Sequence, residues 1–307
     1  MKALVVLIPA GLALLGALSI LAVGWFWKRQ IQSYVRRSPL TKDLLRPPGH
    51  SLRKRIEDLD LDVASYLTAL VAVPLFVYST HISQSYYGGQ SESLPRSAFS
   101  LLLGIGLTTF VGWRLLNLLG RRKLMILGLE GEQATGEELN QLMLDGCRVF
   151  HDIPFPYGNI DHVVVSPSGV FAVNSKMLGK PKGGIGSAEI VVDQQQGIVR
   201  FPDREYRIPV KQFETEANWL SKHLSSAVGQ TVVVESILAL PGWFVKERIG
   251  RGSVFVINPC KPKKFFVHNR QAVSSSLLQQ IAHQLEQLCR DVEPSFQEKR
   301  ARWEDKK

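Results

Sequence analysis

The stretch that most constrains this 307-residue chain lies at its N-terminus, where residues 3–27 carry no charged side chain. At about 1.5 Å per residue, a helix of this length crosses a hydrocarbon core about 30 Å thick. The sequence therefore predicts a transmembrane helix near 3–27. A cleaved signal peptide is the competing interpretation, but its apolar region would be shorter, and Trp25, Phe26 and Trp27 stand where small cleavage-site residues would be needed.

Two further apolar stretches predict membrane spans near 63–82 and 97–119. The first contains Pro74 and the second contains Arg114, so a re-entrant or interfacial role is the alternative for these stretches. Arg114 lies near the end of its stretch, from which its long side chain can reach the headgroups. We therefore expect a membrane region over residues 1–120 with about three transmembrane helices, whose partner is the lipid bilayer.

The distribution of basic residues predicts the orientation of these spans. Residues 28–55 contain nine Lys or Arg and one acidic residue, whereas residues 83–96 contain only Arg96 and Glu92 as charged residues. Lys and Arg close to span ends are retained in the cytoplasm. We expect an integral membrane protein of the bacterial inner-membrane kind, with its N-terminus outside and residues 121–307 in the cytoplasm.

The net charge of +10 is divided unevenly between the two parts of the chain. Residues 1–120 contain 12 Lys and Arg against 6 Asp and Glu, and residues 121–307 contain 25 against 21. The larger excess thus belongs to the membrane region, where anionic lipid accounts for it. Cys147, Cys260 and Cys289 have neither the spacing of a zinc site nor the context of a disulfide framework.

The cytoplasmic part has the size of one domain, and its hydrophobic pattern predicts an α/β fold with a sheet covered by helices on both faces. Alternating and continuous apolar runs predict strands, and a spacing of three to four residues predicts helices. The expected helices are 128–145, 209–227 and 274–290, and the expected strands are 147–153, 160–167, 169–176, 188–193, 197–201, 232–241 and 252–258.

Three segments of this part carry a family resemblance: GEQATGEELNQLMLDGCRVFHDIP, GNIDHVVVSPSGVFAVNSK and PVKQFETEANWLSKHL. They resemble the NERD (nuclease-related) domain over about residues 128–240, and the second segment is the most specific. The family is similar to restriction-endonuclease-like PD-(D/E)xK nucleases. The resemblance implies a mixed sheet flanked by helices and a possible nucleic-acid partner.

The resemblance also implies a site. Asp161 at the start of one strand and Lys176 at the end of the next would be catalytic, Glu132 would join Asp161 in holding Mg²⁺ or Mn²⁺, and Gln212 matches a polar residue on a helix of the same site. A divalent cation held by carboxylates stabilises charge on a phosphoryl group and activates water, and a lysine can steady the phosphate. The ordinary interpretations are a backbone-capping Asp161, a solvated Lys176 and a first-turn acid at Glu132.

One position departs from the family pattern, because Asn174 stands where a carboxylate usually precedes the lysine by two residues. Positions 174 and 176 share one face of a strand, but an amide is a poorer Mg²⁺ ligand than a carboxylate. Either Glu132 and Asp161 suffice, or a relocated acid such as Glu189 or Asp193 helps, or cleavage has been lost.

Three functions are therefore open. The first is a membrane-tethered, metal-dependent nuclease acting on DNA or RNA. The second is a nuclease-like module that binds nucleic acid or another phosphorylated ligand without cutting, for which Asn174 is the main argument. The third is a membrane scaffold that contacts proteins only. The glycine-rich run 179–186 lacks the order of a phosphate-binding loop, and the basic run 261–264 is expected to be solvated.

Overall fold

The computed structural model describes residues 18–19, 22–26, 42–87, 93–183, 188–267 and 272–293. It divides into two compact units, Leu45–Cys289 on one hand and Met1–Leu44 with Arg290–Lys307 on the other. In the second of these, β1 (Leu44–Leu45) and β11 (Arg290–Val292) form a two-stranded sheet, and the Arg290 guanidinium donates to the Asp43 carbonyl at 3.1 Å. The span expected near 3–27 lies mostly outside the described residues.

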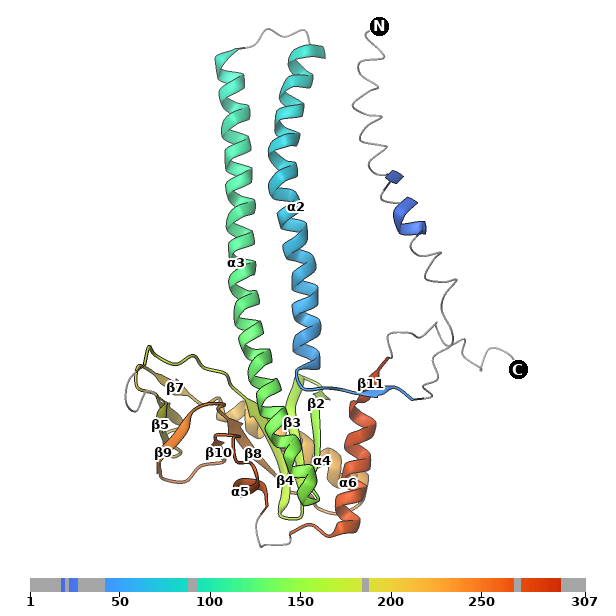
Figure 1. Cartoon of the computed structure of the whole chain (residues 1–307), viewed down its shortest axis with the longest axis vertical. Helices are drawn as coiled ribbons and strands as arrows, with labels where there is room; N and C mark the ends of the chain where they lie inside the picture. The colour runs from blue at the N-terminus through green and yellow to red at the C-terminus, as the bar shows by residue number, and fades with distance from the viewer. Residues whose placement is uncertain are drawn as a thin grey trace, which may run out of the picture. The chain divides into compact units, whose positions relative to one another are not determined.

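The larger unit begins with a helical hairpin, α2 (His50–Tyr87) and α3 (Leu94–Asn140) (Figure 1). Both helices are long and apolar enough to cross a membrane by length and composition, and their most apolar windows are almost entirely unburied. The His81 ring bonds the Ser100 hydroxyl at 3.0 Å near one end of the hairpin, and Arg122 pairs with Asp60 near the other. The expected segments 63–82 and 97–119 therefore lie side by side and antiparallel, with contacts near both ends of the hairpin.

The helix α3 differs from the sequence-based expectation in its length. We expected an apolar span to end near residue 119 and a separate helix to start near residue 128. The structure joins them, because the intervening residues contain no proline and are mostly good helix formers, so nothing interrupts the backbone hydrogen bonds. A short 3₁₀ helix, η1 (Gln141–Asp145), follows, and Gly146 ends it with φ of 80°.

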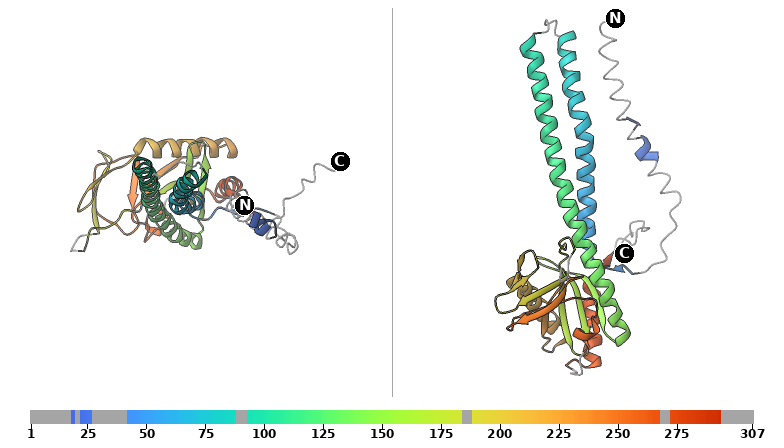
Figure 2. Two further views of the ribbon diagram at one scale, coloured as in Figure 1. Left: turned by 90° about the horizontal axis from the view of Figure 1, so that it is seen from above. Right: turned by 60° about the vertical axis from the view of Figure 1, so that its left-hand side comes forward.

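The main sheet has the strand order β10-β8-β4-β3-β2. Seen from above, the sheet lies between α4 (Val210–Val228) and the last turns of α3 (Figure 2). The strands β2, β3 and β4 are antiparallel, whereas β8 is parallel to β4 and β10 is parallel to β8. The sheet is thus mixed, as expected. Its strands are β2 (Arg148–Phe155), β3 (Gly158–Ser166), β4 (Gly169–Ser175), β8 (Val234–Ala239) and β10 (Val254–Ile257).

Alternating side chains of the main sheet form two cores. Val163 and Val165 pack with α4 (Val210–Val228) and α6 (Ser275–Cys289), whereas Val164 packs on the other face with Leu139 of α3, with η1 and with α5 (Lys263–Phe266). This period of two is what a strand buried on both faces requires. The expectation of helices on both faces is confirmed.

A second sheet has the order β7-β6-β5-β9 and its own apolar core around Trp243. The predicted hairpin of β5 (Glu189–Asp193) and β6 (Ile198–Arg200) is present. The strands β7 (Glu205–Arg207) and β9 (Phe244–Ile249) were not predicted. Both are short and rich in charged residues, and β9 becomes a strand by pairing with β5.

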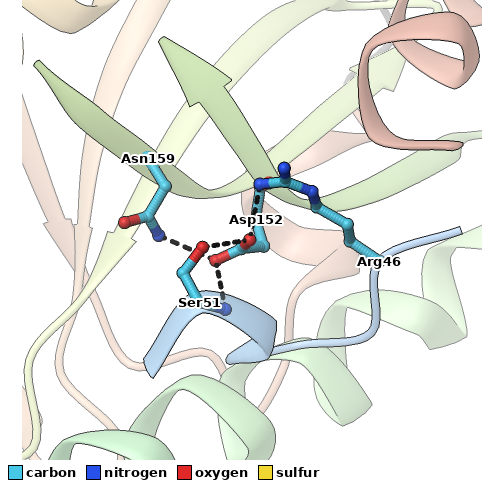
Figure 3. Close-up of polar contacts among 4 residues, drawn as sticks. All are labelled: Arg46, Ser51, Asp152 and Asn159. Atoms are coloured by element: carbon cyan, nitrogen blue, oxygen red, sulfur yellow. Dashed lines mark hydrogen bonds and ion pairs between the residues drawn. The ribbon is translucent and has the colours of Figure 1, made fainter. Parts of the chain in front are cut away.

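The junction between the hairpin and the main sheet is organised by the Asp152 carboxylate, which is fully buried (Figure 3). One carboxylate oxygen accepts the Ser51 backbone N–H at 3.2 Å and the Asn159 amide at 3.0 Å. The other accepts the Ser51 hydroxyl at 2.6 Å and the Arg46 guanidinium at 2.9 Å. Asp152 thereby caps the start of α2 from strand β2, where an anion also suits the helix dipole.

We predict that Asp152→Asn destabilises the protein by about 3–5 kcal/mol, because it leaves the mostly buried Arg46 guanidinium without its counter-charge. Asn tolerates the positive φ of 52° at this position, so the loss reports the charge and not the backbone. Thermal or denaturant unfolding in detergent micelles measures the effect. The control Asp203→Asn removes an exposed pair with Arg204 and should cost about 1 kcal/mol or less. Equal losses of stability for the two substitutions would contradict the role of Asp152 as the counter-charge of Arg46.

Candidate metal and phosphodiester site

Asp161 lies near the start of β3, at the end of the sheet where β4 finishes. One of its carboxylate oxygens accepts the Ser175 backbone N–H at 2.7 Å. Strand alternation places Asp161 on the side of Val163, which α4 covers. Burial raises the pKa of the Asp161 carboxyl, and the nearby negative charges of Glu216 and Asp152 raise it further, against the opposing effects of the Ser175 hydrogen bond and of the Lys176 ammonium. The positive charge of Lys176 therefore does not offset the burial of Asp161 and the negative charges near it.

Asn174, which stands where the resemblance expects a carboxylate, is buried beside Glu216. The sequence did not predict Glu216 as a site residue. The side-chain amide of Asn174 donates to Glu216 at 2.5 Å, and the Gln212 amide donates to the other oxygen of Glu216 at 2.9 Å. Glu216 lies on α4 and is 1% exposed. Burial raises its pKa, although both hydrogen bonds lower it. An acid from the helix α4 thus lies beside the position of β4 at which the resemblance expects a carboxylate.

Glu132 lies on α3, beyond the apolar stretch 97–119. One of its carboxylate oxygens is buried and has no hydrogen-bond partner in the described part of the chain. Burial raises the pKa of Glu132, and repulsion from Asp161 and Asp152 raises it further, whereas Arg55 lowers it. A buried carboxylate oxygen without a hydrogen-bond partner raises the free energy of the folded state. A bound proton or cation would lower it.

Lys176 follows the last residue of β4 and is exposed. Its backbone N–H donates to the Ala239 carbonyl at 2.9 Å, which continues the pairing of β4 with β8 by one residue. Strand alternation places it on the side of Asn174, and its positive charge lowers the pKa of Asp161. The structure therefore brings Lys176 and Asp161 to one edge of the sheet, on the same side.

The residues proposed as relocated acids lie elsewhere. Glu189 and Asp193 belong to β5 of the second sheet. Glu189 pairs with Lys246 at 2.8 Å, and Asp193 pairs with Arg200 at 3.5 Å. The relevant acid is Glu216, and one signal in the sequence pointed to it: Glu216 stands four residues after Gln212 on a predicted helix, so both side chains share one helix face.

The arrangement fits an open Mg²⁺ or Mn²⁺ site better than a closed cage. Within the described ranges, no group of three His, Cys, Asp or Glu side chains is placed to hold a metal ion. Magnesium is commonly held by one or two carboxylates with water and substrate phosphate completing its shell. Glu132 and Asp161 can supply these carboxylates, and the unpartnered oxygen of Glu132 is the group that such an ion would satisfy.

A buried chain of hydrogen bonds supports the site from the opposite face of the sheet. The side-chain amide oxygen of Asn140 bonds His151 Nε2 at 3.1 Å. The Nδ1 atoms of His151 and His162 lie 2.9 Å apart, and His162 Nε2 bonds the Ser175 hydroxyl at 3.1 Å. Burial lowers the pKa of both histidines, which are therefore neutral. Since Asn140 supplies an acceptor, His151 donates from Nε2, His162 donates from Nδ1, and Ser175 donates its hydroxyl. The chain fixes Ser175, whose N–H holds Asp161.

Comparison with known proteins matches residues 127–241 to the nuclease-related domain, NERD. No curated protein and no solved structure matches the chain. The matched region runs from the last turns of α3 to the end of β8, and it includes Glu132, Asp161, Asn174, Lys176 and Glu216. Residues 127–241 therefore form a nuclease-related domain, which confirms the resemblance over this part of the chain.

We predict that the metal-free protein loses stability as the pH rises. The pKa values of Glu132 and Asp161 are raised, so between the ordinary carboxyl pKa and the raised values the folded state binds more protons than the unfolded state. Below about pH 6.5, the ordinary pKa of histidine, the lowered pKa values of His151 and His162 act in the opposite direction. Thermal unfolding with a chelator should therefore show a Tm that falls from about pH 6.5 to about pH 8. Glu132→Gln should flatten this decline and raise the Tm at the upper end, whereas Glu137→Gln, which changes an exposed position of the same helix, should not. If the Tm of Glu132→Gln fell with pH as steeply as that of the parent, the raised pKa of Glu132 would be refuted as the cause.

We also predict opposite effects of Asn174→Asp with and without metal. The substitution removes a donor from buried Glu216 and adds a second carboxylate beside it, which should cost about 1–3 kcal/mol in the metal-free protein. The extra carboxylate should strengthen Mn²⁺ binding. Thermal shifts measured with and without Mn²⁺ separate the two effects. Asn218→Asp, at an exposed position of α4, is the control, and a Mn²⁺ affinity no higher than that of the parent would count against a shared site.

Proposed function

We propose that this chain is a membrane-anchored nuclease, in which the nuclease-related domain of residues 127–241 hydrolyses a phosphodiester of DNA or RNA with Mg²⁺ or Mn²⁺. The single observation that carries the proposal is the buried, unpartnered oxygen of Glu132, whose carboxylate is electrostatically coupled to Asp161. Two carboxylates that repel each other in the absence of a cation are ready to bind one. The apolar windows of α2 and α3 would hold the chain in the bilayer with the domain on the cytoplasmic side.

Each residue of the site has a separate role in this proposal. Glu132 and Asp161 would hold the cation, which would supply charge stabilisation at the phosphoryl oxygens and a more acidic water. Lys176, exposed and on the same side of the sheet, binds the phosphate and orients the attacking water. Asn174 and Gln212 hold Glu216 by hydrogen bonds, so Glu216 faces the site as a base with a raised pKa that can accept a proton from the water.

A second function has one specific observation in its favour. The two oxygens of Glu216 are both occupied by amide donors, so the domain is also compatible with a module that binds a nucleic acid or another phosphorylated ligand without cutting it. Such a module would show metal-independent binding that weakens steeply with salt, as expected when cations of the protein neutralise phosphates. Cleavage products decide between the two functions.

We predict that the full chain in detergent micelles or nanodiscs cleaves labelled DNA or RNA with Mg²⁺ or Mn²⁺ and that a chelator stops the reaction. Lys176→Ala should lower the rate by about 10²–10³, the usual cost of losing one group that stabilises developing charge. The control Lys222→Ala removes an exposed lysine of α4 and should leave the rate unchanged. Binding without products at any metal concentration would replace the nuclease by the binding module.

A further inference from the structure

The positive charge of residues 121–307 is concentrated in the second sheet. Two connections build this sheet: residues 176–209 join β4 to α4, and residues 240–253 join β8 to β10. Together they contain nine Lys and Arg against five Asp and Glu. Residues 121–307 as a whole contain 25 against 21, so the remainder contains 16 of each and is neutral overall. The second sheet, which packs beside β8 and β10 (Figure 1), therefore carries the whole excess.

Most of the acidic side chains in these connections already have a cation beside them. Four of the five form ion pairs within the second sheet: Glu189 with Lys246, Asp193 and Glu205 with Arg200, and Asp203 with Arg204. Among the described residues of the connections, no ion pair involves the other six cations, which are Lys176, Lys180, Lys182, Arg207, Arg248 and Arg251. The excess of positive charge is therefore not neutralised locally.

Three of these six cations follow one another directly after the candidate site, in residues 176–183, which we call the basic segment. Lys176, Lys180 and Lys182 are all exposed, and no acidic residue lies between Asp161 and Glu189 in the sequence. The basic segment starts at the sheet edge where Lys176 and Asp161 lie. Since an extended chain spans at most about 3.3 Å per residue, its last lysine lies within about 20 Å of its first.

The backbone of the basic segment is held by side chains of the second sheet. The fully buried Trp243 donates its indole N–H to the Leu178 carbonyl at 2.9 Å, and the Arg204 guanidinium donates to the Gly179 carbonyl at 2.6 Å. The Lys180 ammonium lies 5.8 Å from the centre of the Trp243 ring. A ligand of this segment would therefore have little backbone to order, which favours binding.

Gly179 leaves one side of this backbone open. Its φ lies outside the left-handed region, and no described atom lies within 4 Å of the place that a Cβ would take. Neither the backbone conformation nor the packing therefore requires a glycine at this position. Close approach of the backbone to a ligand is the other common reason for a glycine. Gly183 has the same two properties, so open backbone lies on both sides of Lys180 and Lys182.

From these observations we propose that the basic segment binds the sugar-phosphate backbone of a nucleic acid on one side of the bond to be cut. Lys180 and Lys182 contact phosphates, and the open backbone at Gly179 lets the strand approach closely. The substrate is then a polymer that extends several nucleotides beyond the site, and not a mononucleotide-sized phosphodiester. The place of the cut rests on the proposed function, whereas the binding can be measured without cleavage.

The first test measures the binding of labelled DNA and RNA oligonucleotides to the full chain in detergent micelles, with a chelator to prevent cleavage. The double variant Lys180→Gln, Lys182→Gln should bind more weakly, and its slope of log affinity against log salt should be smaller by about 1.4–1.8, the value for two lost phosphate contacts. The control Lys261→Gln, Lys264→Gln removes the same charge from another exposed basic run and should keep the slope of the parent. Equal slopes for the two double variants would overturn the inference. So would a parent-like slope for the first, as expected for lysines that contact anionic lipid instead.

A second variant removes no charge. Gly179→Ala should weaken oligonucleotide binding about tenfold, the scale of one lost hydrogen bond to a charged group, because the added methyl group would hold the strand away from the backbone. Its Tm should not fall, since an alanine fits this φ and meets no neighbour among the described atoms. Binding as tight as that of the parent, with an unchanged Tm, would contradict a strand that passes over Gly179.

The third test compares substrate lengths with Mn²⁺ present. In the double variant Lys180→Gln, Lys182→Gln, the ratio of kcat/KM for an oligonucleotide to that for a dinucleotide should fall about tenfold, because a dinucleotide at the site is too short to reach both lysines. The control Lys261→Gln, Lys264→Gln should keep the ratio of the parent. An unchanged ratio in the first variant would overturn the inference and leave the nuclease function standing. Absence of products from every substrate would refute the proposed function, and the binding test would then decide the inference alone.

Discussion

The buried Asp152 carboxylate is the interaction on which the larger unit depends. It closes the start of α2, neutralises Arg46 and accepts the Asn159 amide, so the segment 46–51 and the β2–β3 hairpin, about a hundred residues apart in sequence, meet at one side chain. The position has a positive φ, a conformation that costs a non-glycine residue about 1–3 kcal/mol and persists only where the surroundings enforce it. Its charge also contributes to the raised pKa values of Glu132 and Asp161. The same carboxylate therefore holds the start of the helical hairpin and affects the electrostatics of the candidate site.

The Asn174–Glu216 contact changes how the departure from the family pattern is understood. Where the resemblance expects an acid on β4, the chain has an amide, yet a carboxylate lies beside it, because α4 presents Glu216 there and Gln212 holds it from one helical turn away. A buried carboxylate of this kind is tolerated because both of its oxygens receive hydrogen bonds. An acid thus lies beside the position at which the resemblance expects one, although it comes from a different element.

Much of this architecture was accessible from the sequence, for physical reasons that differ between elements. The period of two in β3 and β4 predicted the hairpin that joins Asp161 to Lys176, and the apolar length of 63–82 and 97–119 predicted the helices that contain them. The strand β9 was missed because its charged side chains carry no apolar pattern and its pairing with β5 is non-local. Glu216 was missed because its burial and its contact with Asn174 depend on tertiary packing, and its position one helical turn after Gln212 was the one signal in the sequence.

Two glycines of α3 show how tightly the site is tied to the helix crossing. Gly136 passes the segment before α2 so closely that a Cβ there would lie 2.6 Å from the Pro48 ring, and Gly131 passes Met177 at a similar distance. Gly136 is one helical turn from Glu132, and Gly131 is adjacent to it. A single methyl group at Gly136 would press on Pro48, and one at Gly131 would press on Met177, just after the end of β4, so either would displace the part of α3 that contains Glu132. Two positions with no side chain thus allow this helix its close approach to the rest of the domain.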